Sequence, residues 1–176
     1  MLVDQGWNQQ QRELYYYTSQ GTFIMPAALL EALESDSGRR FMDPANLSRF
    51  GFIFETNGNS AKNPYGWPIG FAVDTAATPG VPQVGFTCAA CHTGQISYRD
   101  TRIRIDGGQS GIDLNAFMAE LETTIRATAD DDRRRARFLE RAVALGYASA
   151  SVQRDLLGLR DGLAKSGQRT RSEVSA

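Results

Sequence analysis

The sequence predicts a mainly α-helical domain with long loops and one small β-hairpin. After residue 113, apolar side chains recur at helical spacing in three successive segments that reach about residue 163. Residues 51–87 are instead rich in glycine, proline and asparagine and show no helical period. Residues 95–105 alternate between apolar and polar side chains about a polar centre, which is typical of a hairpin.

Three short helices are expected before residue 51. The first lies within residues 8–18 and carries the run Tyr15 to Tyr17, which either lines a cofactor pocket or packs with its hydroxyls at the rim. The second begins at Pro26, a residue that suits the first helical position. The third begins with Asp43 as its N-cap and a proline next to it, and it ends near residue 50.

The run Cys-Ala-Ala-Cys-His from Cys88 to His92 has the pattern of a c-type haem attachment site. Two thiols one helical turn apart can each bond to a vinyl group on one edge of a porphyrin, and the adjacent histidine then ligates the iron. We therefore expect haem c to be bound covalently by Cys88 and Cys91, with His92 as the proximal iron ligand. The sequence nominates no catalytic residue.

Two other roles of a Cys-x-x-Cys pair fit the sequence less well. A zinc site needs four ligands, whereas the whole chain contains two cysteines and one histidine. A thioredoxin-like dithiol needs a strand before it and a helix after it. Residues 79–86 are expected to be a loop with at most a short extended piece, so haem attachment is the favoured interpretation.

Several residues near the motif have two possible roles each. A loop as long as 51–87 is uncommon unless it is functional or wraps something, and a haem edge is one candidate. Within it, Trp67 and Phe71 cover either the haem or a satellite apolar core. On the hairpin, Arg102 and Arg104 either bind the haem propionates, whose carboxylates match a guanidinium, or belong to a solvated face.

The helices after the hairpin have recognisable starts. Asp113 is a suitable N-cap for the first, and three aspartates precede three arginines at the start of the second, where the helix macrodipole favours acidic side chains. The first helix has an apolar stripe made of Leu114, Phe117, Met118, Leu121 and Ile125. The polar tail, residues 166–176, is expected to fray.

Composition argues against several classes of function. Lys and Arg number 19 against 20 Asp and Glu, so nothing indicates nucleic-acid binding or a polybasic membrane surface. No apolar run approaches the roughly 18 residues of a membrane span. The N-terminus has no signal-peptide pattern, although covalent haem attachment normally takes place outside the cytoplasm. We therefore expect a periplasmic or otherwise extracytoplasmic protein, in which residues 1–176 are a single c-type cytochrome domain and a fragment of a longer chain.

Four segments carry a resemblance to a known family: YTSQGT (17–22), NPYGWPIGF (63–71), VGFTCAACHTGQ (84–95) and RIDGG (104–108). Through them the chain resembles the N-terminal half of bacterial dihaem c-type cytochromes related to cytochrome c peroxidases and rubber oxygenase. The resemblance implies a cytochrome c-like haem domain with covalent haem. Family members carry a second Cys-x-x-Cys-His in a C-terminal half, which this sequence lacks. Peroxidase or oxygenase activity is therefore expected only if a second haem domain is joined to the chain.

The leading hypothesis is electron transfer by this haem within a dihaem oxidoreductase, with a redox partner protein or a second haem domain as its partner. Two alternatives are a reactive haem that binds oxygen or peroxide, and a truncated product without haem. His92 is the only histidine, which excludes bis-histidine ligation within one protomer. The remaining options for the sixth ligand are a thioether from Met25, Met42 or Met118, or the open or water-occupied site that we favour.

Overall fold

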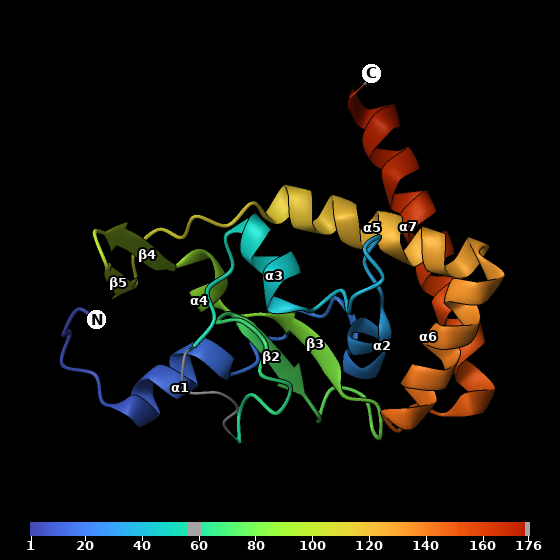
Figure 1. The fold of residues 1–176 in the computed structure, drawn as a ribbon. Coiled ribbons are helices and arrows are strands. Elements are labelled where there is room, and N and C mark those ends of the chain that lie inside the picture. Colours follow the sequence, from blue (N-terminus) through green and yellow to red (C-terminus); the bar gives the residue numbers. More distant parts are fainter. Residues whose placement is uncertain (56–60, 175–176) are drawn as a thin grey trace. The chain divides into compact units, whose positions relative to one another are not determined.

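Two antiparallel β-sheets accompany the helices, so the protein is of mixed α/β class (Figure 1). The prediction of a mainly α-helical fold is wrong. The computed structural model describes residues 1–55 and 61–174, with side chains up to residue 163. One sheet has the order β1–β3–β2 and the other pairs β4 with β5. These strands are β1 Met25–Pro26, β2 Phe71–Asp74, β3 Gln83–Phe86, β4 Thr93–Tyr98 and β5 Thr101–Asp106.

The unexpected sheet includes part of the segment 51–87 that we expected to be a loop. Its strands β2 and β3 pair in antiparallel register, from Phe71 opposite Phe86 to Asp74 opposite Gln83. Each has only four residues, too few for alternation to stand out in the sequence. A Cβ atom at Gly85 in β3 would lie 1.4 Å from the carbonyl oxygen of Thr22. That glycine therefore marks a close approach of the backbone before β1 to the strand β3.

The chain forms two compact units. The first contains residues 1–27 and 42–114, and the second contains residues 28–41 and 115–176. The interpretation of residues 1–176 as a single domain stays a prediction. None of the helices among the described residues is long and apolar enough to cross a membrane.

Two short helices of the first unit begin at side-chain caps, of which Asp43 was predicted and Asn8 was not. The side chain of Asn8 accepts a hydrogen bond from the Gln11 amide at 2.9 Å and starts α1, Gln9–Tyr17. The Asp43 carboxylate accepts from Ala45 N, also at 2.9 Å, and starts α3, Pro44–Leu47, which continues as the 3-10 helix η1, Ser48–Phe50. Both predicted helices are confirmed, whereas α2, Ala27–Ala32, begins one residue after Pro26.

An aromatic cluster forms much of the core of the first unit. The ring of Phe71 lies 5.0 Å from that of Phe86 and 5.1 Å from that of Phe52, measured between centroids. Trp67 also packs on Phe71, with 6.1 Å between the ring centroids. Trp67 and Phe71 are both buried. Both contribute to the apolar core of this unit, which was one of their two predicted roles, and covering the haem stays a prediction.

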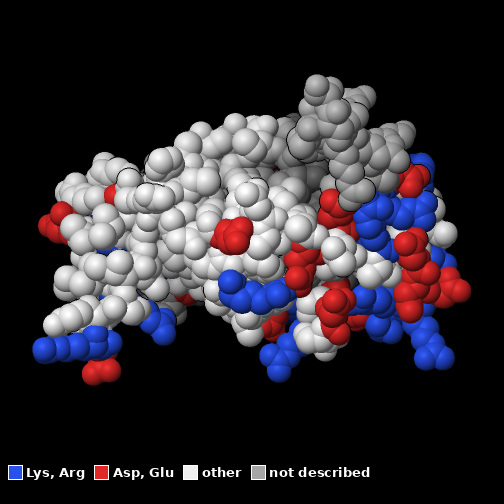
Figure 2. All heavy atoms as spheres, turned by 90° about the horizontal axis from the view of Figure 1, so that it is seen from above, with Lys and Arg blue, Asp and Glu red and all other residues white. Residues whose placement is uncertain are grey.

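The second unit contains the three helices that were predicted after the hairpin. They are α5 Leu114–Asp130, α6 Asp132–Ala144 and α7 Ser149–Val174. Asp131 caps α6 by accepting a hydrogen bond from Arg134 N at 2.8 Å. Basic and acidic side chains are interspersed over the part of the molecule that α6 and α7 occupy (Figure 2). The tail at 166–176 was expected to fray, whereas α7 is helical up to Val174. Residues 175–176 lie outside the described part of the chain.

Candidate haem-attachment site

The predicted attachment motif forms a single helical turn, α4, Cys88–Cys91. The hydroxyl of Thr87 caps the turn by accepting a hydrogen bond from Ala89 N at 3.2 Å. At the other end, His92 N donates to the carbonyl oxygen of Cys88 at 2.9 Å. The turn follows β3 directly and β4 begins immediately after it, so the motif is held between strands of the two sheets.

The side chains of the turn divide between the core and the solvent. Ala89 and Ala90 are buried, and Ala89 packs in a cluster with Tyr16, Tyr17 and Ile69. Cys88 and Cys91 are exposed free thiols, and His92 is exposed as well. Residues three apart share one face of a helix, so both thiols leave the turn on the same side.

The helix α1 contacts both ends of this turn. The hydroxyl of Tyr15 donates a hydrogen bond to the His92 carbonyl oxygen at 2.6 Å. The hydroxyl of Thr87 donates to the Tyr16 carbonyl oxygen at 3.1 Å. Burial raises the pKa of Tyr15, which keeps its phenol protonated and able to donate.

The carboxylate of Asp106, at the end of β5, anchors α1 next to the motif. It is only 3% exposed. Its Oδ1 accepts a hydrogen bond from the Tyr16 hydroxyl at 2.5 Å, and its Oδ2 lies 3.3 Å from Nε of Arg12. Burial, together with the hydrogen bond to Asp106, raises the pKa of Tyr16 well above its usual range. Sequence reasoning missed Asp106 as a site residue because its partners lie about 90 residues away along the chain.

The two arginines that were candidates for haem propionates have different surroundings. Arg104 binds groups of the protein itself: Nη1 lies 3.5 Å from a Glu55 carboxylate oxygen, and Nη2 donates to the Phe54 carbonyl oxygen at 3.3 Å. Arg102 is exposed and lines an open cleft of about 520 Å³, together with Ser48 and Gln95. Binding of a propionate by either arginine stays a prediction.

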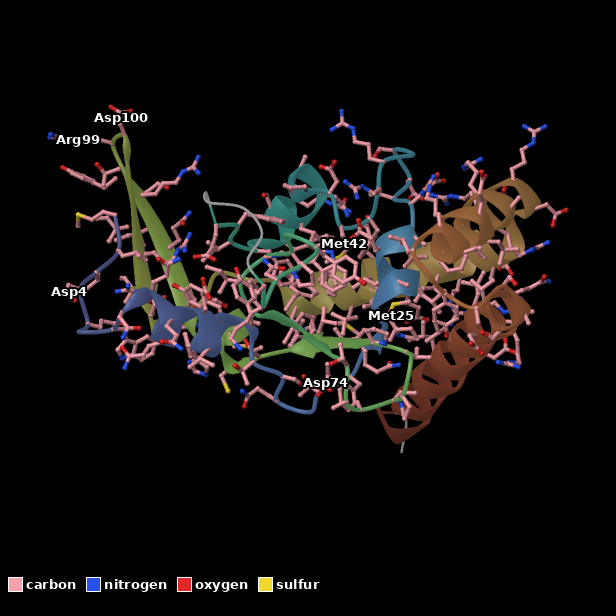
Figure 3. All side chains as sticks on the ribbon, turned by 90° about the horizontal axis from the view of Figure 1, so that it is seen from below. Asp4, Met25, Met42, Asp74, Arg99 and Asp100 are labelled. Atoms are coloured by element: carbon pink, nitrogen blue, oxygen red, sulfur yellow. The ribbon has the colours of Figure 1, made fainter. Side chains whose placement is uncertain are left out.

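The methionines considered as the sixth iron ligand differ in their burial and in the unit to which they belong. Met25, opposite Val84 in the β1–β3 pair, and Met42 are both buried in the first unit (Figure 3). Met118 lies on α5 of the second unit and is 36% exposed, so it is not the core residue that the apolar stripe indicated. Neither Met25 nor Met42 can present its sulfur at the surface around His92 without leaving the core.

The other roles of a Cys-x-x-Cys pair can now be compared with the structure. The four-residue strand β3 precedes the motif, which agrees with the short extended piece expected there, but an antiparallel hairpin follows it in place of a long helix. The described elements around the motif therefore do not form the βαβ context of a thioredoxin-like dithiol. Among the described residues, no three or more His, Cys, Asp or Glu side chains are grouped to hold a metal ion.

Comparison with known proteins shows a similarity that covers part of this chain. An uncharacterized protein of Sinorhizobium fredii (strain NBRC 101917 / NGR234), y4iJ, is 35% identical over 136 residues, which covers 65% of this chain and 22% of that protein. The chain thus spans about a fifth of the length of the relative. No family model matches the chain, and no solved structure matches it. The match assigns neither a family nor an activity.

Proposed function

We propose that the chain is a c-type cytochrome domain that carries one haem on Cys88 and Cys91 and ligates its iron through His92. The observation that carries the proposal is the division of the α4 side chains: both thiols are free and exposed on one face, while the alanines between them are held in the core. The imidazole that follows is exposed too. This donor set fits a haem that is attached by one edge and ligated from the adjacent residue.

The proposed role is electron transfer within a larger dihaem oxidoreductase. When bound, the haem supplies one-electron redox chemistry. The residues of the chain would hold the porphyrin through two thioether bonds and fix the backbone that carries His92. The resemblance of the four segments around the motif to dihaem cytochromes supports this role. The partner is a second haem domain or a redox protein, and the setting is periplasmic or otherwise extracytoplasmic, where such haems are attached.

Covalent attachment is tested by a haem stain on a denaturing gel. The chain is expressed with an export signal and haem-maturation machinery, alongside Cys88→Ala, Cys91→Ala and the double variant. The wild-type band should stain because thioether bonds survive denaturation, and the double variant should not. Ser97→Ala, an exposed change on β4, is the matched control and should stain like the wild type.

The pyridine haemochrome spectrum of the single variants adds a second readout. Each should retain one thioether bond and one free vinyl group, and its absorption band should shift accordingly. An unstained wild-type band, from cells that mature a control cytochrome, would contradict the proposal and favour a product that lacks haem.

A further inference from the structure

The attachment turn is held at both ends by consecutive residues of α1. Tyr15 donates its hydroxyl hydrogen bond to the His92 carbonyl oxygen, and Tyr16 accepts one from Thr87 through its own carbonyl oxygen. The His92 carbonyl oxygen also accepts a hydrogen bond from Gly107 N at 2.8 Å. A carbonyl oxygen has two lone pairs, so both are used. The peptide plane that follows the proposed iron ligand is thus fixed from two sides.

α1 is itself anchored independently of the motif. The Tyr16 hydroxyl and the Arg12 guanidinium both bind the buried Asp106 carboxylate at the end of β5. Trp7 packs edge-on against the Tyr15 ring, with 5.1 Å between the ring centroids. The Tyr15 hydroxyl is therefore held in position by contacts that do not involve α4, which is what a positioning residue requires.

We propose that Tyr15 is a positioning residue for His92 and that α1, through Tyr15 and Tyr16, orders the attachment turn before haem is bound. The consequence of this proposal for the iron ligand rests on the proposed haem function. The orientation of the His92 ring depends on the backbone of His92, and α1 holds that backbone. The polar groups around a metal-ligating histidine commonly fix its orientation. Here the contact is made through the backbone of that histidine, which leaves both ring nitrogens free.

The test compares two matched variants on α1. Tyr15→Phe removes the hydroxyl that reaches His92, whereas Tyr17→Phe removes a hydroxyl that donates to Glu55 at 3.0 Å and keeps the ring that packs near Ala89. In the full chain without haem, amide hydrogen exchange is measured over residues 88–93. Loss of one hydrogen bond should speed local opening about two- to tenfold in Tyr15→Phe. The Tyr17→Phe variant should exchange there like the wild type.

Thr87 provides the same comparison at the other end of the turn. Thr87→Val removes the hydroxyl that caps Ala89 N and binds the Tyr16 carbonyl oxygen, so exchange at Ala89 should rise. Thr87→Ser keeps the hydroxyl and should restore the wild-type rate. Equal exchange over residues 88–93 in all four variants would overturn the proposal, as would an acceleration by Tyr17→Phe equal to that by Tyr15→Phe.

The haem-containing protein supplies a readout that a purely structural role would not change. Cyanide at the open sixth position makes the ferric haem low-spin, and the g-values of the electron paramagnetic resonance spectrum of this adduct depend on how the axial imidazole is oriented over the porphyrin. They should shift in Tyr15→Phe and stay constant in Tyr17→Phe. Unchanged g-values in Tyr15→Phe would show that the hydroxyl does not orient His92. If neither the wild type nor any variant acquires haem, the proposed function fails, and hydrogen exchange still decides whether α1 orders the turn.

Discussion

At the scale of single residues, the buried Asp106 carboxylate joins α1 to the strand that ends beside the motif. Two side chains donate to it, a phenol and a guanidinium, and the backbone carbonyl of the same residue accepts from Gln5 Nε2 at 2.6 Å. A carboxylate with so little exposure depends on these partners, since water cannot replace them.

Tyr16→Phe removes one of these donors without changing the shape of the core. It should lower the free energy of unfolding by about 1–3 kcal/mol, because the Asp106 carboxylate then loses a buried hydrogen bond. Urea denaturation followed by circular dichroism measures the change. Tyr98→Phe is the control, because Tyr98 is 62% exposed and should alter stability by no more than about 0.5 kcal/mol. Equal effects of the two changes would contradict this role of Asp106.

The attachment turn packs closely against Gly70. Its φ is +94°, and a Cβ atom there would lie 2.4 Å from the Cα atom of Ala90. Gly70→Ala should therefore combine backbone strain of about 1–3 kcal/mol with a displacement of α4. We expect a lower unfolding free energy and faster amide exchange at Ala90. Gly80→Ala is the control. Gly80 is exposed and nothing lies within 4 Å of the new Cβ, so this change introduces similar strain without displacing α4.

At the scale of elements, a buried glutamate connects α6 to the 28–41 segment of the second unit. Glu34 is 6% exposed, Arg137 Nη2 binds one of its carboxylate oxygens at 2.7 Å, and Arg141 binds the other. These arginines lie four residues apart on one face of α6. The negative charge of the Glu34 carboxylate is therefore neutralised by the side chains of Arg137 and Arg141.

Removing Arg137 and Arg141 together should cost more than removing all three charges. The double alanine variant leaves Glu34 buried without its helical partners, which should lower the unfolding free energy by about 3–5 kcal/mol. Adding Glu34→Gln should recover part of that loss. Asp36→Ala is the control, since Asp36 is 81% exposed and its pair with Arg134 is worth about 1 kcal/mol or less. A triple variant less stable than the double would contradict the interpretation.

A second contact ties the start of α7 to the turn before it. The Tyr147 hydroxyl donates to the Asp155 carboxylate at 2.8 Å. Burial, with a further contribution from that hydrogen bond, raises the pKa of Tyr147 to about 12. The folded state therefore holds the phenol proton more tightly than the unfolded chain, where the pKa is near 10.

The stabilisation by this phenol should be complete below about pH 10 and lost as the pH rises through about 12. Unfolding free energies of the wild type and of Tyr147→Phe are compared at about pH 8 and about pH 11. The advantage of the wild type should shrink at the higher pH. A constant difference between the two proteins would show that the phenol proton is not linked to folding.

At the scale of the whole molecule, the sixth coordination position of the proposed haem depends on which side chains the fold makes available. His92 is the only histidine, and Met25 and Met42 of its own unit are in the core, whereas the third methionine of that unit, Met1, is exposed at the N-terminus. The two buried sulfurs are not available at the surface around His92. We therefore expect an open or water-occupied sixth position.

The ferric holoprotein should therefore show substantial high-spin character, and the ferrous form should bind carbon monoxide. Met25→Leu and Met42→Leu conserve side-chain volume and should cost less than about 1.5 kcal/mol of stability. Neither change should alter the optical spectrum, and the exposed Met118→Leu serves as the comparison. A fully low-spin ferric spectrum that becomes high-spin in one of these variants would identify that methionine as the ligand.

The sequence by itself determined the features that depend on neighbouring residues. The polar and aromatic run at 8–18, the Asp43 cap with its proline, the acidic start at 130–132 and the apolar spacing after residue 113 act within one or two turns, so α1, α3, α5, α6 and α7 were predictable. The β4–β5 hairpin was predictable for the same reason, because its alternation and turn are continuous along the chain. The Cys-x-x-Cys-His spacing is equally local, and it nominated the three haem residues.

Only the tertiary structure decided which distant segments meet. The sheet β1–β3–β2 pairs Met25 with Val84, and strands of two to four residues carry no local pattern that selects a partner. The contacts of Tyr15 with His92 and of Tyr16 with Asp106 likewise join segments separated by 77 and 90 residues. Burial is a property of the assembled fold, which is why helical spacing alone misplaced Met118 in the core. For the same reason the sequence did not show that both thiols are exposed: their exposure depends on the packing of the two alanines between them in the core.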